Sequence, residues 1–313
     1  MINRNVLRIM MARGSGDRTL KKINEYIKKN TLYSLDDICN SVALMCSLGI
    51  NQDVAKNIYE NHENVLWLED KLLEQNVDMC WIGDECFPEG IRKLSIGSIP
   101  AVLFYKGNFK LLQGKCVGFT GSRQVSDVGI RITDISARQL SSNGIWVISG
   151  YAKGVDITAH KAALQTGGST VFVIVEGILR NRVKGEIKEL LNDKNHLFVS
   201  QFMPNITWSA SNAMKRNNTI IGLSDAMILI EAGMTGGTFN AGEQSLKNKK
   251  PLFVVEYREK KSTSKGNDFF LQHGGMPLRG DKNGNPVLRK VYSALEQGNK
   301  RNRSYEQLSF DFL

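Results

Sequence analysis

A glycine-rich stretch with the sequence "SGYAKGVDITAH" has the composition of a loop that binds an anion through backbone N–H groups. It covers residues 149–160 and places Lys153 between two glycines. Glycine lets the backbone approach a bound group closely, and the helix expected to follow favours negative charge at its N-terminus. We interpret this stretch as a phosphate-binding loop. Within it, we expect Asp156 to cap the helix and His160 to form local hydrogen bonds.

Three other segments combine glycine with polar or basic side chains at the end of an apolar run. They are "TGSRQ" (120–124), "EGILRNR" (176–182) and "EAGMTGGT" (231–238). One such loop indicates little by itself. Four loops at equivalent places, most of them with lysine or arginine, indicate a crevice that accepts phosphate groups.

The elements that must position these loops are short, buried strands. Five runs are apolar on consecutive residues, as expected of strands covered on both faces: 116–120, 145–149, 170–176, 225–231 and 251–257. Amphipathic segments separate them and are expected to be helices: 126–143, 156–166 and 239–248. This alternation predicts an α/β fold with a doubly wound, mostly parallel sheet. Ligands of such sheets bind beyond the carboxyl ends of the strands, where the four loops converge.

The pattern divides the chain into three parts. Residues 1–75 have helical spacing, with Ser34 and Asn51 at expected N-cap positions, and predict a small helical domain. Residues 76–292 are expected to form a Rossmann-like binding domain that includes a strand at "AVLFYKG". Residues 293–313 read as a polar tail.

Charge and composition narrow the classes of partner. The net formal charge of +10 favours a polyanionic partner, nucleic acid first. The apolar runs are too short to span a bilayer and the N-terminus has no small-residue cleavage site, so we expect a cytoplasmic protein without membrane attachment. The 5 cysteines are scattered without a CxxC pair, and the 4 histidines lie far apart. We therefore expect neither a disulfide framework nor a metal site.

No nucleotide or catalytic fingerprint accompanies the loops. "GSRQVSDVG" lacks the G-x-G-x-x-G spacing, and Ser149 stands where a ribose-binding acid is expected, which disfavours NAD and FAD. Neither a G-x-x-x-x-G-K-[ST] nor a G-x-S-x-G motif occurs. Glu176, Glu231 and Glu243 are scattered and are interpreted as hydrogen-bond partners rather than a general acid–base pair. We expect no cofactor and no enzymatic activity.

An ordered set of motifs resembles the DNA processing protein A family, also called Smf. The matching motifs stand in the family's order: Phe87-Pro88, Ile99-Pro100 to Gly107, Gly121-Ser122-Arg123, Ser149 to His160, Arg216-Asn217 before "NTIIGLS", and "EAGMTGGTFNA". Each motif is modest, but the ordered set with matching spacing is specific. The resemblance covers well over half of the chain.

The resemblance implies an extended Rossmann-like fold and a homodimer. It also implies that the protein binds single-stranded DNA, protects it and loads a RecA-type recombinase during transformation and recombination. The family has no established catalytic activity. Carried over by position, it places DNA-phosphate contacts or their surroundings at Gly121, Ser122, Arg123, Ser149, Gly150, Lys153, Gly154, Arg216 and Asn217. The ring of Tyr151 either stacks on a base or packs on neighbouring side chains.

The chain departs from the family's motifs at two places. The third position of the family's "RNR" is Asn218, which removes one expected positive contact. The "SG" of the fourth loop is Thr235-Gly236, followed by a further glycine, Gly237. Both departures predict weaker or differently shaped binding.

The C-terminal stretch "EQLSFDFL" resembles short peptides that dock into the bacterial sliding clamp. The relevant side chains would be Gln307, Leu308 and Phe310. Packing of these residues on the protein's own surface is the alternative that we favour.

Two other functions stay open on sequence alone. The fourth loop distantly resembles phosphoribohydrolases that release cytokinin-type bases, but the proline of their "PGGxGTxxE" motif is missing and Glu243 is displaced. The same crevice would also suit a sensor of a nucleotide second messenger. Both alternatives predict tight binding of a small ligand, whereas single-stranded DNA predicts affinity that rises with oligonucleotide length.

Overall fold

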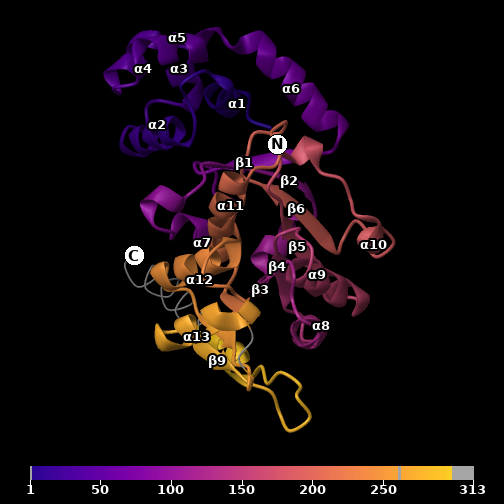
Figure 1. Cartoon of the computed structure of the whole chain (residues 1–313). Helices are drawn as coiled ribbons and strands as arrows, with labels where there is room; N and C mark the ends of the chain where they lie inside the picture. The colour runs from indigo at the N-terminus through magenta and orange to yellow at the C-terminus, as the bar shows by residue number, and fades with distance from the viewer. Residues whose placement is uncertain (1, 260–261, 298–313) are drawn as a thin grey trace, which may run out of the picture.

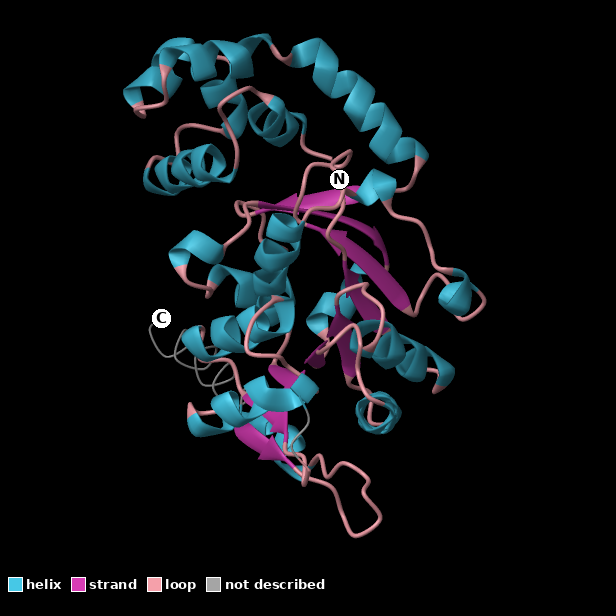
Figure 2. Ribbon diagram, viewed as in Figure 1, coloured by secondary structure: helices cyan, strands magenta, loops and turns pink. Residues whose placement is uncertain are grey.

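Nine strands form one sheet over residues 2–259 and 262–297, which are the residues described by the computed structural model of this chain (Figures 1 and 2). The strands are β1 (Asp78–Trp81), β2 (Val102–Gly107), β3 (Cys116–Thr120), β4 (Trp146–Ser149), β5 (Thr170–Val173), β6 (His196–Ser200), β7 (Ala226–Leu229), β8 (Leu252–Val255) and β9 (Met276–Leu278). All five apolar runs interpreted as strands form strands, and so does "AVLFYKG". Strands β1, β6 and β9 were not predicted.

The sheet is mostly parallel, as expected. Its strand order is β1-β2-β6-β5-β4-β3-β7-β8-β9, and all pairs from β6 to β9 along this order are parallel. Strand β2 pairs antiparallel with both β1 and β6 at one edge. From β3 the chain adds β4, β5 and β6 on one side and β7, β8 and β9 on the other, so the switch point of this doubly wound sheet lies between β3 and β7. Ligands of open α/β sheets bind at such a point.

The helices are α1 (Arg4–Met11), α2 (Asp17–Lys29), α3 (Leu35–Cys39), α4 (Val42–Ser47), α5 (Gln52–Glu60), α6 (His62–Glu74), α7 (Glu89–Arg92), α8 (Asp127–Ser142), α9 (Val155–Gln165), α10 (Gly185–Lys188), α11 (Ala210–Leu223), α12 (Gly237–Lys247) and α13 (Lys265–Gln272). The three helices predicted between the strands, over 126–143, 156–166 and 239–248, begin and end within two residues of the expected positions, as α8, α9 and α12. Ser34 caps α3 and Asn51 caps α5, which confirms both predicted N-caps.

Helices cover both faces of the sheet and bury its apolar strands. On one face, residues of α7, α11, α12 and α13 pack against the sheet in one apolar cluster. On the other face, α8, α9 and a helical segment over residues 289–297 form a second cluster. This two-sided cover explains why the central strands are apolar on consecutive residues.

The helical N-terminal segment shares its core with the sheet. Helices α1–α6 lie together at the end of the molecule beyond the β1 edge (Figure 1). Their buried side chains form one continuous cluster with residues of the sheet, including Trp81 and Phe104. The carboxylate of Asp17 accepts a hydrogen bond from the backbone N–H of Ala101 at 3.0 Å. Apolar packing and a polar contact therefore both join the two parts.

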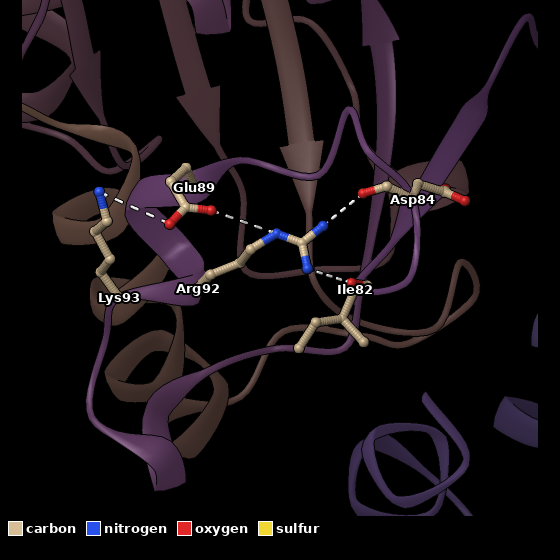
Figure 3. A network of polar contacts seen from close by, with 5 residues as sticks. All are labelled: Ile82, Asp84, Glu89, Arg92 and Lys93. Carbon is tan, nitrogen blue, oxygen red and sulfur yellow. Dashed lines mark hydrogen bonds and ion pairs between the residues drawn. The ribbon is translucent and has the colours of Figure 1, made fainter. Parts of the chain in front are cut away.

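A polar network fixes the turn between β1 and α7 (Figure 3). Arg92 donates hydrogen bonds to the backbone carbonyls of Ile82 and Asp84. The Glu89 carboxylate lies 3.7 Å from both the Arg92 Nε and the Lys93 Nζ. One arginine thus satisfies the carbonyls of the turn and orients α7.

Helix α7 in turn supports α11. A Cβ at Gly90 would lie 2.1 Å from the backbone oxygen of Gly222, so the two helices approach at a distance that only glycine permits. Helix α11 carries Arg216 and Asn217. The motif region around "FPEGIR" therefore positions residues that are far from it in sequence.

The C-terminal boundary differs from the prediction. Residues 289–297 are helical and pack on the sheet through Val291 and Leu295, so the polar tail does not begin at residue 293. The predicted clamp-binding residues Gln307, Leu308 and Phe310 lie outside the described residues. None of the helices within the described ranges combines the length and apolar character that a bilayer crossing requires.

Candidate nucleic-acid interface

Two adjoining pockets lie beyond the carboxyl ends of β3, β4, β5 and β7. One, of about 450 Å³, is lined mainly by the loops after β3, β4 and β5. The other, of about 480 Å³, is lined by the loops after β3 and β7 and by the first half of α11. They share Arg123, Ala152, Trp208 and Arg216, and we call them together the crevice. A larger pocket of about 670 Å³ lies beside the ends of β8 and β9, but it contains no residue of the four loops.

The positive charge of the crevice comes from side chains of three different loops. Arg123 follows β3 and Lys153 follows β4, and both are exposed. Lys184, which lies between β5 and β6, also lines the first pocket. Burial lowers the pKa of Lys184 from its ordinary value, and the carboxylate of Glu186 opposes this shift. The crevice thus presents cations that suit phosphate oxygens.

Tyr151 occupies a fixed position between the crevice and the core. Its ring lies edge-on to Phe172 and Phe198, with centroids 5.2 and 5.8 Å away. Its hydroxyl accepts a hydrogen bond from the Lys184 backbone N–H at 2.7 Å, and the Lys184 ammonium lies 4.3 Å from the ring centroid. Of the two interpretations of Tyr151, this geometry agrees with packing on neighbours.

Arg216 lies at the floor of the crevice rather than at its surface. Only 6% of the residue is exposed, and its Nη1 donates a hydrogen bond to the backbone carbonyl of Val173 at 3.0 Å. Its Nε is buried and has no hydrogen-bond partner among the described residues. Burial lowers the pKa of Arg216, and the nearby Asp156 carboxylate opposes this shift.

Asp156 is a buried partner of the floor and not the N-cap of α9. The N-cap is Gly154, and Asp156 lies in the first turn of the helix. Its Oδ2 accepts a hydrogen bond from the backbone N–H of Ala152 at 3.3 Å. Burial raises its pKa, and the charge of Arg216 opposes the rise. The predicted cap was therefore wrong, although the role is structural.

The side chain of Ser149 faces the interior. It is fully buried, and its hydroxyl donates a hydrogen bond to the backbone carbonyl of Phe119 at 2.8 Å, which joins β4 to β3. It lines neither pocket of the crevice. The Ser149 hydroxyl is therefore not positioned to contact a phosphate in the crevice, because Ser149 is the last residue of β4 and its side chain is buried.

Asn217 and the loop after β3 shape the second pocket. The Asn217 amide donates hydrogen bonds to the backbone carbonyl of Gly237 at 3.0 Å and to the Asn240 side chain at 3.3 Å, which ties α11 to the start of α12. Gly121 and Ser122 line the same pocket, and the Ser122 hydroxyl accepts a hydrogen bond from the Gln124 N–H at 3.0 Å. These three residues lie where the sequence predicted them.

The fourth loop leaves the start of α12 open. Gly236 is the N-cap of this helix, with φ of +93°, and no side chain caps the first turn. The loop residues Thr235, Gly236 and Gly237 line the second pocket. The first N–H groups of a helix without a side-chain cap favour a negative group nearby.

His160 forms local hydrogen bonds, as predicted. The residue is fully buried, with its Nδ1 2.6 Å from the Thr170 hydroxyl and its Nε2 2.6 Å from the Gly150 carbonyl. Since a carbonyl only accepts, Nε2 carries the proton. Burial lowers the pKa of His160 to about 3, so the ring is neutral at physiological pH.

Glycines 150 and 154 permit close approaches inside the protein. A Cβ at Gly150 would lie 1.8 Å from the Arg216 Nη1 and 2.3 Å from the Asp156 Oδ2. Gly154 has φ of +78°, and a Cβ there would lie 2.4 Å from the Ser122 backbone oxygen. The loop after β4 therefore depends on these glycines for its own packing.

Gly154→Ala is expected to lower the free energy of unfolding by about 2–4 kcal/mol, because strain at positive φ adds to a backbone clash. Chemical denaturation measures this loss. Gly167→Ala is the matched control, since Gly167 has φ of +79° but no atom within 4 Å of an added Cβ. Equal losses in both variants would contradict the close approach at Ser122.

Sequence reasoning missed Trp208. It lies in the segment between β6 and α11, is 52% exposed and lines both pockets. The guanidinium of Arg123 lies 5.7 Å from its ring centroid. The unpredicted strand β6 explains the omission, because without it the segment "NITWS" has no place beside the crevice. An exposed tryptophan before the "KRNN" motif was the available signal.

The sequence model of the family described as DNA recombination-mediator protein A matches residues 78–284, which include every loop of the crevice. The chain belongs to this family. The matched range also includes the turn network at α7 and all strands from β1 to β9.

Relatives within the family resemble the chain over different shares of their length. The DNA processing protein DprA of Streptococcus pneumoniae is 31% identical over 193 residues, which are 61% of this chain and 67% of that protein. Protein Smf of Escherichia coli is 26% identical over 215 residues, 68% of this chain but only 56% of that protein. DprA of Bacillus subtilis is 25% identical over 237 residues, 75% of each chain.

Solved structures of the recombination-mediator family share the fold. The X-ray structure of the Streptococcus pneumoniae protein superposes with a TM-score of 0.75 at 25% identity and covers 88% of this chain and 95% of its own. The Helicobacter pylori protein, whose structure addresses its single-stranded DNA binding mode, superposes with a TM-score of 0.56 at 23% identity. It covers 72% of this chain and 97% of its own. The extended Rossmann-like fold is thereby confirmed.

One departure from the recombination-mediator motifs lies outside the crevice. Asn218 follows Arg216 and Asn217 on α11, but it lines neither pocket.

Proposed function

We propose that the protein binds single-stranded DNA in the crevice, protects it and hands it to a RecA-type recombinase in the cytoplasm. The observation that carries this proposal is the convergence of the four glycine-containing loops and Arg123, Lys153 and Lys184 on two adjoining pockets. Membership of a DNA recombination-mediator family supports it. Affinity would come mainly from phosphate contacts at Arg123 and Lys153.

The shape of the crevice favours a polymer over a mononucleotide. The two pockets are continuous through shared residues, and two of these, Arg123 and Arg216, bring positive charge to both. A nucleic-acid backbone needs a string of small phosphate sites, whereas a cofactor needs one deep slot. The crevice offers the former.

The acids near the crevice support a binding protein rather than an enzyme. Glu231 is fully buried and accepts hydrogen bonds from the backbone N–H and hydroxyl of Ser126 at the start of α8. Asp156 is buried beside Arg216. Both carboxylates therefore make structural contacts, Glu231 with the start of α8 and Asp156 with the floor of the crevice. We propose that the protein acts without catalysis, as a homodimer.

Titration with labelled oligo-dT of several lengths, single- and double-stranded and at two salt concentrations, tests this proposal. We expect tight, single-strand-selective binding that strengthens with length and weakens steeply with salt. Absence of binding at low salt would overturn the proposal. Saturable binding of a mononucleotide without DNA binding would favour a sensor, and release of free base from a nucleoside monophosphate would favour a phosphoribohydrolase.

A further inference from the structure

We propose that Trp208 is the residue on which a nucleobase stacks in the crevice, and that the loop after β5 holds its segment in place. This inference rests on the proposed binding of single-stranded DNA, which it extends from phosphate contacts to base contacts. The group that Trp208 would bind is the flat face of a base. Trp208 lies outside the family motifs identified in the sequence.

Trp208 combines an exposed ring with a place on the wall of both pockets. Trp81, which packs in the core, is 7% exposed, whereas Trp208 is 52% exposed although it borders both pockets. Large aromatic side chains that stabilise a fold are mostly buried. An exposed indole between two pockets offers an apolar plane at the point where a bound strand passes from one pocket to the other.

The charge beside the indole is placed for a nucleotide. The Arg123 guanidinium lies 5.7 Å from the Trp208 ring centroid and lines the same two pockets. A base on the ring would bring its phosphate close to a cation that is already present. Stacking on aromatic side chains tolerates every base, as a protein that handles DNA of any sequence requires.

The segment around Trp208 is held by hydrogen bonds on both sides. The Gly177 N–H donates to the Ile206 carbonyl at 2.8 Å, and the Leu179 N–H donates to the Pro204 carbonyl at 3.1 Å. A Cβ at Gly177 would lie 2.2 Å from the Pro204 oxygen, so this approach requires glycine. On the other side, Ser209 caps α11. The backbone that carries the ring is therefore already held in place before a base binds.

Tyr151 does not compete for this role. Its ring edge-packs on Phe172 and Phe198, and the Lys184 ammonium lies 4.3 Å from its ring centroid. A base would have to displace that ammonium to stack there. For Trp208, the cation near the ring among the described residues is Arg123, which is exposed and free to move aside.

The test compares two oligomers with equal numbers of phosphates, one of thymidines and one of abasic deoxyribose units. The full chain is titrated with each, as wild type and as Trp208→Leu and Trp208→Phe. Trp67→Leu is the matched control, because Trp67 is 55% exposed but lies on α6, away from the crevice. Circular dichroism checks that each variant is folded.

We expect wild type to prefer the thymidine oligomer and Trp208→Leu to lose about tenfold of its affinity for it, or about 1.4 kcal/mol. Affinity of Trp208→Leu for the abasic oligomer and its salt dependence should stay at wild-type values, since Arg123 and Lys153 remain. Trp208→Phe should restore most of the preference, and Trp67→Leu should behave as wild type.

An unchanged preference for thymidine in Trp208→Leu would overturn the inference while leaving the proposed DNA binding intact. Failure of wild type to bind either oligomer would overturn both. The intrinsic fluorescence of tryptophan gives a second readout, since stacking should quench emission in wild type and not in Trp208→Leu. Equal quenching in the two proteins would also contradict stacking on Trp208.

Discussion

Arg123→Ala/Lys153→Ala is expected to weaken single-stranded DNA binding by about 10- to 100-fold at about 0.1 M salt. Both side chains are exposed and line the first pocket, so their removal takes away phosphate contacts without cutting into the core. Each phosphate contact on a single strand contributes about −0.7 to the slope of log affinity against log salt. The double variant should therefore flatten that slope by about 1.4.

The matched control is Lys106→Ala/Lys110→Ala. These lysines are also exposed. Lys106 lies near the carboxyl end of β2, and because β2 runs antiparallel to β6, this end lies beside the amino end of β6, opposite the crevice. The control removes the same net charge. If both double variants lost affinity equally, binding would depend on overall charge and not on the crevice.

His160 is expected to make the fold sensitive to acid. Its pKa is lowered to about 3 by burial, whereas the unfolded chain takes up a proton near pH 6.5. Between these values the unfolded state binds one proton more than the folded state, so stability falls as pH decreases through this window. The loss from this residue approaches about 1.4 kcal/mol for each pH unit well below 6.5.

His160→Gln tests this expectation, because glutamine does not titrate and its amide N–H can still reach the Gly150 carbonyl. We expect the variant to be less stable at pH 7 but to lose less stability than wild type between pH 6 and pH 4. Urea unfolding at several pH values measures both slopes. His62→Gln makes the same substitution at an exposed histidine on α6 and serves as the control. Parallel slopes in wild type and His160→Gln would contradict the buried neutral ring.

The fold follows from the sequence to the extent that local patterns determine it. The five central strands are apolar on consecutive residues, and the glycine loops after β3, β4, β5 and β7 converge because the carboxyl ends of parallel strands share one edge. Strand β6, "HLFVS", was missed because the segment before it is polar and contains the short helix α10 in place of a long one, so the alternation of strand and long helix is interrupted there. Strand β9 has three residues and no apolar run of its own.

The site was predictable in its loops but not in the direction of each side chain. Arg123 and Lys153 are exposed at loop positions, where the backbone leaves the sheet. Ser149 and Arg216 belong to regular elements, and their directions depend on strand pleat and helix phase, which place both in the interior. Trp208 was missed because its position beside the crevice depends on hydrogen bonds between its segment and the loop after β5, which are contacts between segments far apart in sequence.

The apolar cluster that α1–α6 share with Trp81 and Phe104 makes the helical segment part of the sheet's own stability. If either part is removed, the apolar side chains at the contact between the two parts become exposed to water. The free energy of unfolding then falls in proportion to the apolar area exposed. A chain cut near residue 75 would therefore expose the apolar side chains of this cluster, such as Trp81 and Phe104, to water. The N-terminal helices and the sheet that carries the crevice are therefore expected to unfold together.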